Sequence, residues 1–280
     1  MKRCPETPAG SDVEFSGHVW VQELPTGAEF RFQVAASGLV TVATASQSYE
    51  TAASVPPQYR RAADCIDQRL DRKALEAATD DPSDVTFCGI ATRNEGIEFD
   101  WQRLPAFVGV DVWSGRQDRF LPPDSATGVF ERLGLPTLPA IDKEVPAAHI
   151  DVTQYTEGSE FPQSEWRDGH AAGVLIRDKS GGRAVARCDD GRSQSAPDAR
   201  TAAVLAEEYA TDDRIERAAA ALRTDGHSVT VEGVRDRLVS DVARESYVDL
   251  FSGGEFVASL AAFQSAVAER VQKSLSDGNR

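Results

Sequence analysis

The sequence predicts an α+β protein, with a core of antiparallel sheets and flanking helices followed by an all-helical domain. β-Forming residues cluster over 13–44 between glycine- and proline-containing turns, which is typical of an antiparallel meander. Two further apolar runs surround a glycine-containing turn within 173–187 and predict a β-hairpin. Beyond about residue 195, apolar residues recur at helical spacing. We therefore expect two domains, at 1–195 and 196–280.

The elements of the first domain follow from local patterns. Ala62, Ile66 and Leu70 recur every four residues and predict one face of a helix. Gly134 is a stop signal for a later short helix. In order, we expect strands within 13–15, 18–21, 30–34 and 39–43, a helix over 58–78, strands at 85–90 and 107–113, a short helix over 126–133, and the hairpin at 173–187.

The second domain is expected to contain four helices. Thr211 or Asp212 can cap the second of them, and Gly226 follows its end, as glycine commonly does after a helix. The four helices are expected at 200–209, 212–223, 231–247 and 255–275.

The charge of the chain limits the partners it can have. Forty-five acidic residues oppose 30 basic residues, which gives a formal net charge of −15. This excess argues against broad, non-specific binding of phosphate backbones. Together with the scarcity of lysine, it indicates a halophilic protein, because strong charge maintains solubility where salt screens self-repulsion. An ordinary acidic protein is the alternative.

Membrane, metal and disulfide signals are weak. No apolar run approaches the roughly 20 residues that span a bilayer, and we expect a cytoplasmic protein. Neither the histidines nor the cysteines have metal-ligand spacing. We expect Cys4, Cys65, Cys88 and Cys188 to be small buried residues rather than a disulfide framework or a zinc site.

Several phrases occur in an order that resembles a known family. A strand ends in Phe87-Cys88-Gly89, the next strand reads Phe107-Val108-Gly109-Val110-Asp111, and Gly134-Leu135-Pro136 and the hairpin at 173–187 follow. This order is similar to that of ATP-dependent RNA ligases of the covalent nucleotidyltransferase superfamily, and the chain resembles a divergent, haloarchaeal-type member. The resemblance implies an RNA-ligase-like nucleotidyltransferase core, a role in RNA processing or repair, and ATP and Mg²⁺ if the family activity is retained.

The same resemblance implies a catalytic set that this chain lacks. RNA ligases attack the α-phosphate of ATP with the lysine of a Lys-x-Asp-Gly phrase, and glutamates and further lysines assist. The corresponding phrase is expected to be Ala35-Ala36-Ser37-Gly38, so that Ala35 occupies the lysine position. Ile90 and Ala172 are expected where the family has glutamates. Ala184 and Ala186, or Val185 if the register slips by one, are expected where it has lysines.

The residues that remain suggest a pocket remnant. We expect it to comprise Gly38, Gly89, Phe107, Asp111, Gly173, Ile176 and Arg177. Each has a structural alternative: Gly38 as a turn glycine, Phe107 as core, Asp111 as an acceptor for backbone donors, and Arg177 as a solvated charge. Lys179 fits Lys-x-x-Gly formally, but it lies in the hairpin turn. If the chain has lost the family's catalytic residues, the side chains that replace them (Ala35, Ile90, Ala172 and Ala184 or Ala186) should converge on one cavity.

Three functions remain open at this point. The first is an RNA-ligase-like protein that has lost covalent adenylylation and serves nucleotide sensing, RNA-end binding or an active ligase partner. The second is an active, divergent RNA ligase with a covalent lysine–AMP step. The third is a structural or interaction protein without nucleotide affinity. The sequence supports no metal ligand and no catalytic residue, and it leaves the oligomeric state open.

Overall fold

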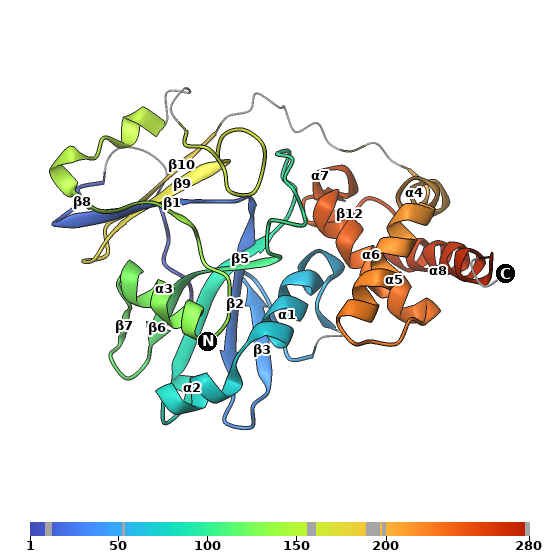
Figure 1. Ribbon diagram of the computed structural model, residues 1–280, viewed down its shortest axis with the longest axis horizontal. Coiled ribbons are helices and arrows are strands. Elements are labelled where there is room, and N and C mark those ends of the chain that lie inside the picture. The colour runs from blue at the N-terminus through green and yellow to red at the C-terminus, as the bar shows by residue number, and fades with distance from the viewer. Residues whose placement is uncertain (9–12, 52–53, 156–160, 189–196, 198–199, 278–280) are drawn as a thin grey trace. The chain divides into compact units, whose positions relative to one another are not determined.

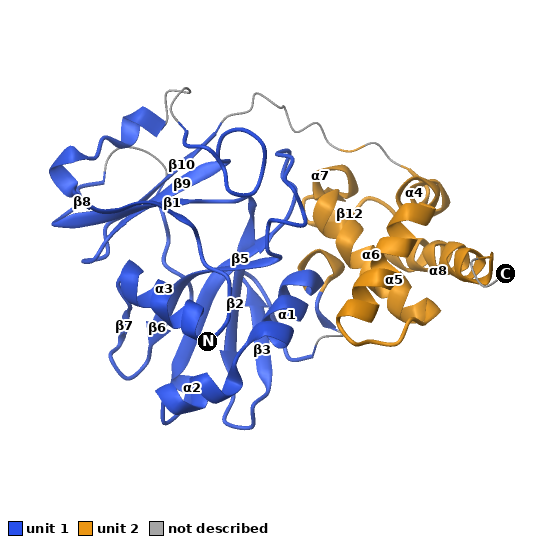
Figure 2. Ribbon diagram, viewed as in Figure 1, with its two compact units in different colours: residues 1–55, 60–192 blue, residues 56–59, 193–280 orange. Residues whose placement is uncertain are grey.

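The computed structural model describes residues 1–8, 13–51, 54–155, 161–188, 197 and 200–277. The chain divides into two compact units, which are described separately (Figure 2). Unit 1 comprises residues 1–55 and 60–192, and unit 2 comprises residues 56–59 and 193–280. Strands dominate unit 1 and helices dominate unit 2, so the predicted α+β class is confirmed.

Unit 1 contains two antiparallel sheets (Figure 1). The four-stranded sheet has the order β10 (Arg183–Arg187), β9 (Gly173–Asp178), β1 (His18–Glu23) and β8 (Ala140–Pro146). The six-stranded sheet has the order β4 (Ser48–Tyr49), β3 (Val40–Thr44), β2 (Gly27–Val34), β5 (Val85–Thr92), β6 (Phe107–Ser114) and β7 (Arg119–Phe120). The predicted hairpin at 173–187 is confirmed as the pair β9–β10.

The predicted meander over 13–44 is partly wrong. β2 and β3 form a hairpin, but β1 pairs with β8 and β9 in the other sheet. The chain therefore changes sheets between Glu23 and Gly27. Alternation of β-formers indicates how a strand is buried, and it does not identify the strand's partner. For this reason, the sequence pattern predicts that β1 is a strand but does not predict the sheet to which it belongs.

Short helices accompany the sheets of unit 1. They are α1 (Pro57–Arg69, of which residues 57–59 are assigned to unit 2), α2 (Arg72–Ala78) and α3 (Pro123–Arg132), with 3₁₀ turns at Pro82–Asp84, Ala147–His149 and Val152–Tyr155. The single helix expected over 58–78 is divided at Leu70–Asp71. The Asp71 carboxylate accepts a hydrogen bond from the Ala74 N–H at 2.9 Å and so caps α2.

An aromatic cluster fills the face of the six-stranded sheet beneath α3. Phe32 of β2 and Phe87 of β5 stack with ring centroids 4.5 Å apart. Phe107 of β6 meets Phe32 edge-on at 5.8 Å, and Phe130 of α3 meets Phe87 edge-on at 5.8 Å. These rings are fully buried and anchor β5 and β6 against the helix.

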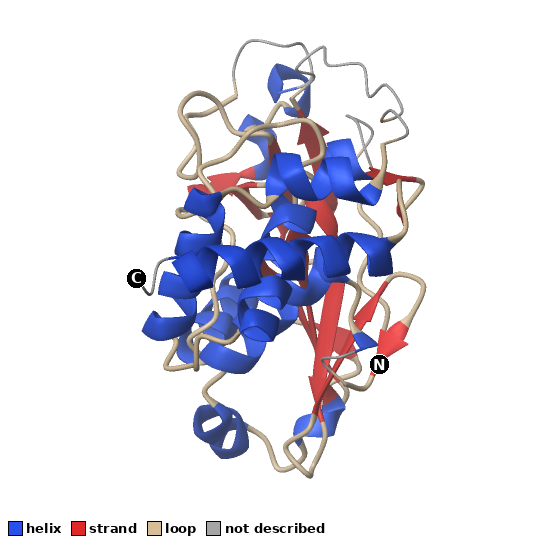
Figure 3. Ribbon diagram, turned by 90° about the vertical axis from the view of Figure 1, so that its right-hand side faces the viewer, coloured by secondary structure: helices blue, strands red, loops and turns tan. Residues whose placement is uncertain are grey.

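Unit 2 is mainly helical (Figure 2). Figure 3 distinguishes the helices of the molecule from its strands by colour. It contains α4 (Ala202–Tyr209), α5 (Asp212–Thr224), α6 (Val231–Glu245), α7 (Tyr247–Leu250), β11 (Phe251–Ser252), β12 (Glu255–Phe256) and α8 (Leu260–Asp277). Thr211 caps α5 as predicted, and a shared apolar core joins the helices. The helix expected from residue 255 begins only at Leu260, because Phe251–Phe256 form a small β-ladder. Among the described residues, every helix is too short or too polar to cross a bilayer.

Candidate functional site

A pocket of about 230 Å³ lies between the two sheets of unit 1. Apolar side chains from both sheets form much of its wall. Two arginines and two carboxylates supply its charged groups. Its lining comprises Leu24, Gly27, Ala28, Glu29, Gly89, Ile90, Val110, Asp111, Leu175, Arg183, Val185 and Arg187, together with Cys4, Pro5 and Thr7.

The connection from β1 to β2 builds the floor of this pocket. The Leu24 N–H donates to the Gly173 carbonyl at 2.8 Å, and the Thr26 hydroxyl donates to the Arg93 carbonyl at 2.7 Å. Gly27 has φ +152°, and a Cβ on it would lie 2.3 Å from the Ala91 carbonyl oxygen. Only glycine fits there. These contacts hold the Leu24 side chain, which is 6% exposed, against the pocket.

Leu24-Pro25-Thr26-Gly27 has the same spacing as a Lys-x-Asp-Gly phrase and lies between two early strands. Ala35 lies elsewhere. Its N–H donates to the Leu39 carbonyl in the β2–β3 turn, where Gly38 has φ +82°. The eight residues of β2 separate this turn from Gly27 by roughly 25 Å. Ala35 and Gly38 are therefore remote from the pocket, and Leu24 is the pocket residue that the sequence reasoning missed.

The register of β10 decides which of its side chains face the pocket. Arg183, Val185 and Arg187 line it, whereas Ala184 and Ala186 are buried in the core on the opposite face. Of the two registers considered from the sequence, the one that uses Val185 agrees with this geometry. Side chains alternate along a strand, so a slip of one residue exchanges the two faces.

The other predicted positions are divided between pocket and core. Ile90, Gly89 and Asp111 line the pocket. Ala172 and Ile176 are fully buried in core clusters, and Phe107 belongs to the aromatic cluster. A Cβ on Gly173 would lie 2.9 Å from the Ala186 carbonyl oxygen, so Gly173 permits the close approach of β9 and β10. The expected convergence of Ala35, Ile90, Ala172 and Ala184 or Ala186 is not found, because only Ile90 reaches the pocket.

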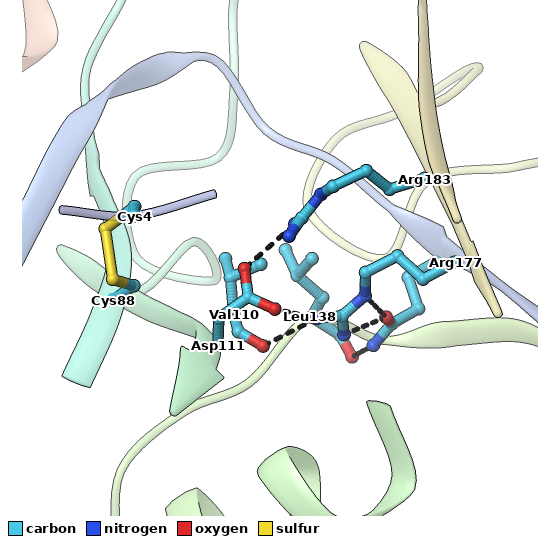
Figure 4. A network of polar contacts seen from close by, with 8 residues as sticks. Cys4, Cys88, Val110, Asp111, Leu138, Arg177 and Arg183 are labelled. Atoms are coloured by element: carbon cyan, nitrogen blue, oxygen red, sulfur yellow. Dashed lines mark hydrogen bonds and ion pairs between the residues drawn. A yellow bond between two sulfur atoms is a disulfide. The ribbon is translucent and has the colours of Figure 1, made fainter. Parts of the chain in front are cut away.

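Arg177 lies behind the pocket in a buried polar network with Asp111 and Arg183 (Figure 4). Arg177 Nη1 donates to Asp111 Oδ1 at 2.8 Å, and Arg183 Nη2 donates to Asp111 Oδ2 at 2.8 Å. Arg177 Nε also donates to Gln22 Oε1 at 3.1 Å, and Gln22 Nε2 donates to the Leu138 carbonyl at 3.2 Å. Burial lowers the pKa of Arg177, and the Asp111 charge opposes that shift.

Arginines already engage the carboxylate that is best placed for the magnesium ion that the family resemblance implies. Asp111 and Glu29 are the carboxylates in the pocket lining. Both oxygens of Asp111 already accept hydrogen bonds from arginines, and Glu29 lies 3.5 Å from Arg31 Nε. Within the described ranges, no group of three or more His, Cys, Asp or Glu residues is placed to hold a metal ion. A metal ion at Asp111 would therefore have to displace one of these arginine contacts.

The lining also lacks a lysine among the described residues. Lys179 lies in the β9–β10 turn, where its Nζ is 2.7 Å from Glu144 and 3.4 Å from Asp124. The Glu144 hydrogen bond raises the pKa of Lys179, which keeps the amine protonated and non-nucleophilic. The structural alternative for Lys179, an exposed turn residue, agrees with this position.

A disulfide joins Cys4 to Cys88 beside the pocket (Figure 4). Their Cα atoms are 5.8 Å apart, although 84 positions separate them in the sequence. The prediction of four separate cysteines is therefore wrong for this pair, and Cys65 and Cys188 lie outside the disulfide. Spacing in the sequence contains no signal for a pair that meets only after the sheet has formed.

Comparison with family models and with curated proteins finds no match. Solved structures similar in fold include an archaeal ATP-dependent RNA ligase, with 14% identity, a TM-score of 0.48, and coverage of 99% of this chain and 66% of the ligase. Another is an RNA ligase of Naegleria gruberi with pyrophosphate, with 14% identity, a TM-score of 0.45, and coverage of 62% of this chain and 50% of the ligase. The chain thus spans about two thirds of the first protein and half of the second.

Proposed function

We propose that this chain is an RNA-ligase-like protein that binds a nucleoside phosphate without forming a lysine–nucleotide adduct. The observation that carries the proposal is Leu24, which lines the pocket three residues before Gly27. A nucleophilic lysine in an RNA ligase precedes its glycine by the same interval. An alkyl side chain has no lone pair with which to attack an α-phosphate.

The replacements around Leu24 support loss of the whole covalent step. Ile90 and Val185 line the same pocket and present only methyl and methylene groups. The resemblance implies a glutamate at the first position and, in the register that uses Val185, a lysine at the second. Without that lysine, the pocket lacks the amine that in the family helps to offset the charge developing on the leaving pyrophosphate.

Two features support retained binding of a ligand. Ile90 and Val110 on one sheet, with Leu175 on the other, form apolar walls suited to a planar base. Arg187 also lines the pocket, where its Nη1 donates to the Pro25 carbonyl at 3.2 Å, and the remaining N–H groups of its guanidinium can donate to a phosphate. Arg183 adds a second guanidinium, which Asp111 holds in place.

The covalent step is tested with α-labelled ATP and magnesium or manganese at high salt, followed by denaturing electrophoresis. We expect no labelled band. A band that disappears when one lysine is replaced would show that the chain is an active ligase and would overturn the proposal.

Binding is tested by calorimetric titration of ATP into oxidised and reduced protein. We expect saturable binding that Arg187→Ala weakens about tenfold, the loss of one charge-assisted contact. Arg116→Ala is the matched control, because Arg116 is exposed in the β6–β7 turn away from the pocket lining. Absence of saturable binding in both redox states would favour the structural or interaction protein instead.

A further inference from the structure

The segment Lys2–Pro8, named here the N-terminal strap, forms part of the pocket wall. Cys4, Pro5 and Thr7 belong to the lining. At about 230 Å³, the pocket is smaller than the roughly 300–1,000 Å³ of most small-molecule sites. The strap therefore occupies space that a nucleoside phosphate needs.

The strap extends from the six-stranded sheet to the edge of the four-stranded sheet. Near its start, Lys2 Nζ lies 3.7 Å from the centroid of the Trp113 ring, and the Lys2 carbonyl accepts a hydrogen bond from Arg31 at 3.2 Å. Near its end, the Pro8 carbonyl accepts a hydrogen bond from the Val185 N–H at 3.1 Å. The strap thus spans the gap between β6 and β10, the two strands that flank the pocket.

These non-covalent contacts are few, and the strap is poorly buried. Lys2, Arg3, Glu6 and Pro8 are exposed, and none of the strap residues is fully buried. An exposed cation–π contact and single hydrogen bonds each contribute about 1 kcal/mol or less. Little apolar surface is removed from water to hold the segment. The covalent bond from Cys4 to Cys88 is therefore the main restraint on the strap.

The position of Cys88 connects this restraint to the pocket. Cys88 lies on β5 next to Gly89, which lines the pocket, and it is 1% exposed. Cys4 is half-buried and is the more accessible sulfur of the pair. A thiolate that attacks the disulfide would reach Cys4 first and leave Cys88 as the departing thiolate.

We propose that the Cys4–Cys88 disulfide is a redox gate, whose reduction releases the N-terminal strap and opens the pocket. A dithiol reductant supplies two electrons and two protons. The sulfur–sulfur bond breaks, Cys4 and Cys88 each become a thiol, and the dithiol closes to its own disulfide. The nucleoside phosphate as ligand rests on the proposed function, whereas release of the strap does not.

The gate is tested on the full chain by hydrogen–deuterium exchange at the Val185 amide, which donates to the strap. We expect exchange about tenfold faster after reduction with a dithiol, because the Pro8 acceptor is then lost. Cys4→Ser should exchange at the reduced rate without reductant. Cys65→Ser is the matched control, because Cys65 lies outside the Cys4–Cys88 disulfide, and it should keep the redox response.

Thiol titration and ligand binding separate the outcomes. Reduction should raise the number of titratable thiols by two, from Cys4 and Cys88. An unchanged number of titratable thiols, or equal Val185 exchange in both redox states and in Cys4→Ser, would overturn the gate. Faster exchange with ATP binding tightened about tenfold supports both proposals. Faster exchange with no ATP binding in either state supports the gate and overturns the proposed function.

Discussion

Arg177 on β9 donates a hydrogen bond to Asp111 on β6 at 2.8 Å and so joins the two sheets of unit 1. The two side chains are 4% and 7% exposed. Arg183, 12% exposed, contacts the other oxygen of the same carboxylate. Two guanidinium groups are therefore paired with one buried carboxylate at the pocket wall, and this pairing fixes the orientation of Arg183 in the pocket. Its value lies in positioning and charge compensation, since buried ion pairs contribute little net stability by themselves.

Removing the shared carboxylate should be costly. Asp111→Ala leaves two largely buried cations without their counter-ion, and we expect the free energy of unfolding to fall by about 3–5 kcal/mol. Urea denaturation followed by circular dichroism measures the change. Asp168→Ala is the control, because Asp168 is fully exposed, and it should leave stability unchanged. Equal stability of the two variants would contradict the role given to the network.

Glu23 should produce a distinct pH dependence. Burial raises its pKa, while hydrogen bonds from the Ser164 hydroxyl and the Glu165 N–H oppose that shift. The folded state therefore holds the proton to higher pH than the unfolded state, and stability falls as pH rises from the unfolded pKa through the raised folded pKa. Glu23→Gln removes this titration. We expect its stability relative to the wild type to increase as pH rises over that window.

Denaturation midpoints at a series of pH values measure the Glu23 effect. The glutamine amide also loses one of the two hydrogen bonds, so the slope with pH is the readout rather than the absolute stability. Glu216→Gln is a suitable control, because Glu216 is exposed on α5. Parallel pH profiles for wild type and Glu23→Gln would show that burial of Glu23 does not perturb its titration.

Introduced amines can locate the lysine position. In reduced protein, we expect ATP to slow acylation of the amine in Leu24→Lys about fivefold or more, because bound ligand covers the pocket. The amine in Ala35→Lys lies in the β2–β3 turn and should react at one rate with or without ATP. Mass spectrometry of labelled peptides measures both rates. Protection at position 35 alone would support the original assignment of the lysine position to Ala35.

Gly27 should tolerate no side chain. A Cβ there would lie 2.3 Å from the Ala91 carbonyl oxygen and 2.7 Å from Ile90 Cγ2, at φ +152°. We expect Gly27→Ala to lower the free energy of unfolding by about 3 kcal/mol or more. Gly17→Ala provides the comparison, because Gly17 has φ +65° with no atom within 4 Å of the added Cβ, and about 1 kcal/mol is expected. Equal losses would mean that backbone conformation rather than crowding governs Gly27.

Local patterns in the sequence predicted most elements of the fold. β5, β6 and the β9–β10 hairpin occur where alternation and turn residues indicated them. The caps and stops of α5 were also predicted, through Thr211 and Gly226. These signals depend on residues within a few positions of each other, so they can be recognised in one sequence without knowledge of the tertiary structure.

The pocket depended on relationships that the sequence does not encode locally. A one-residue register decided that Val185 rather than Ala184 or Ala186 faces the pocket. The change of sheet after β1 placed Leu24 at the floor and removed Ala35 from it.

By itself, the sequence determined the α+β class, the helical region after the sheets and the absence of a conventional lysine phrase, because each follows from composition and short-range spacing. Only the tertiary structure decided which residues share the pocket, that Asp111 holds two arginines, and that Cys4 meets Cys88. The physical reason is that these contacts join strands far apart in sequence. The Asp111 ion pairs and the Cys4–Cys88 disulfide form only when the strands that carry these residues have been brought together by folding.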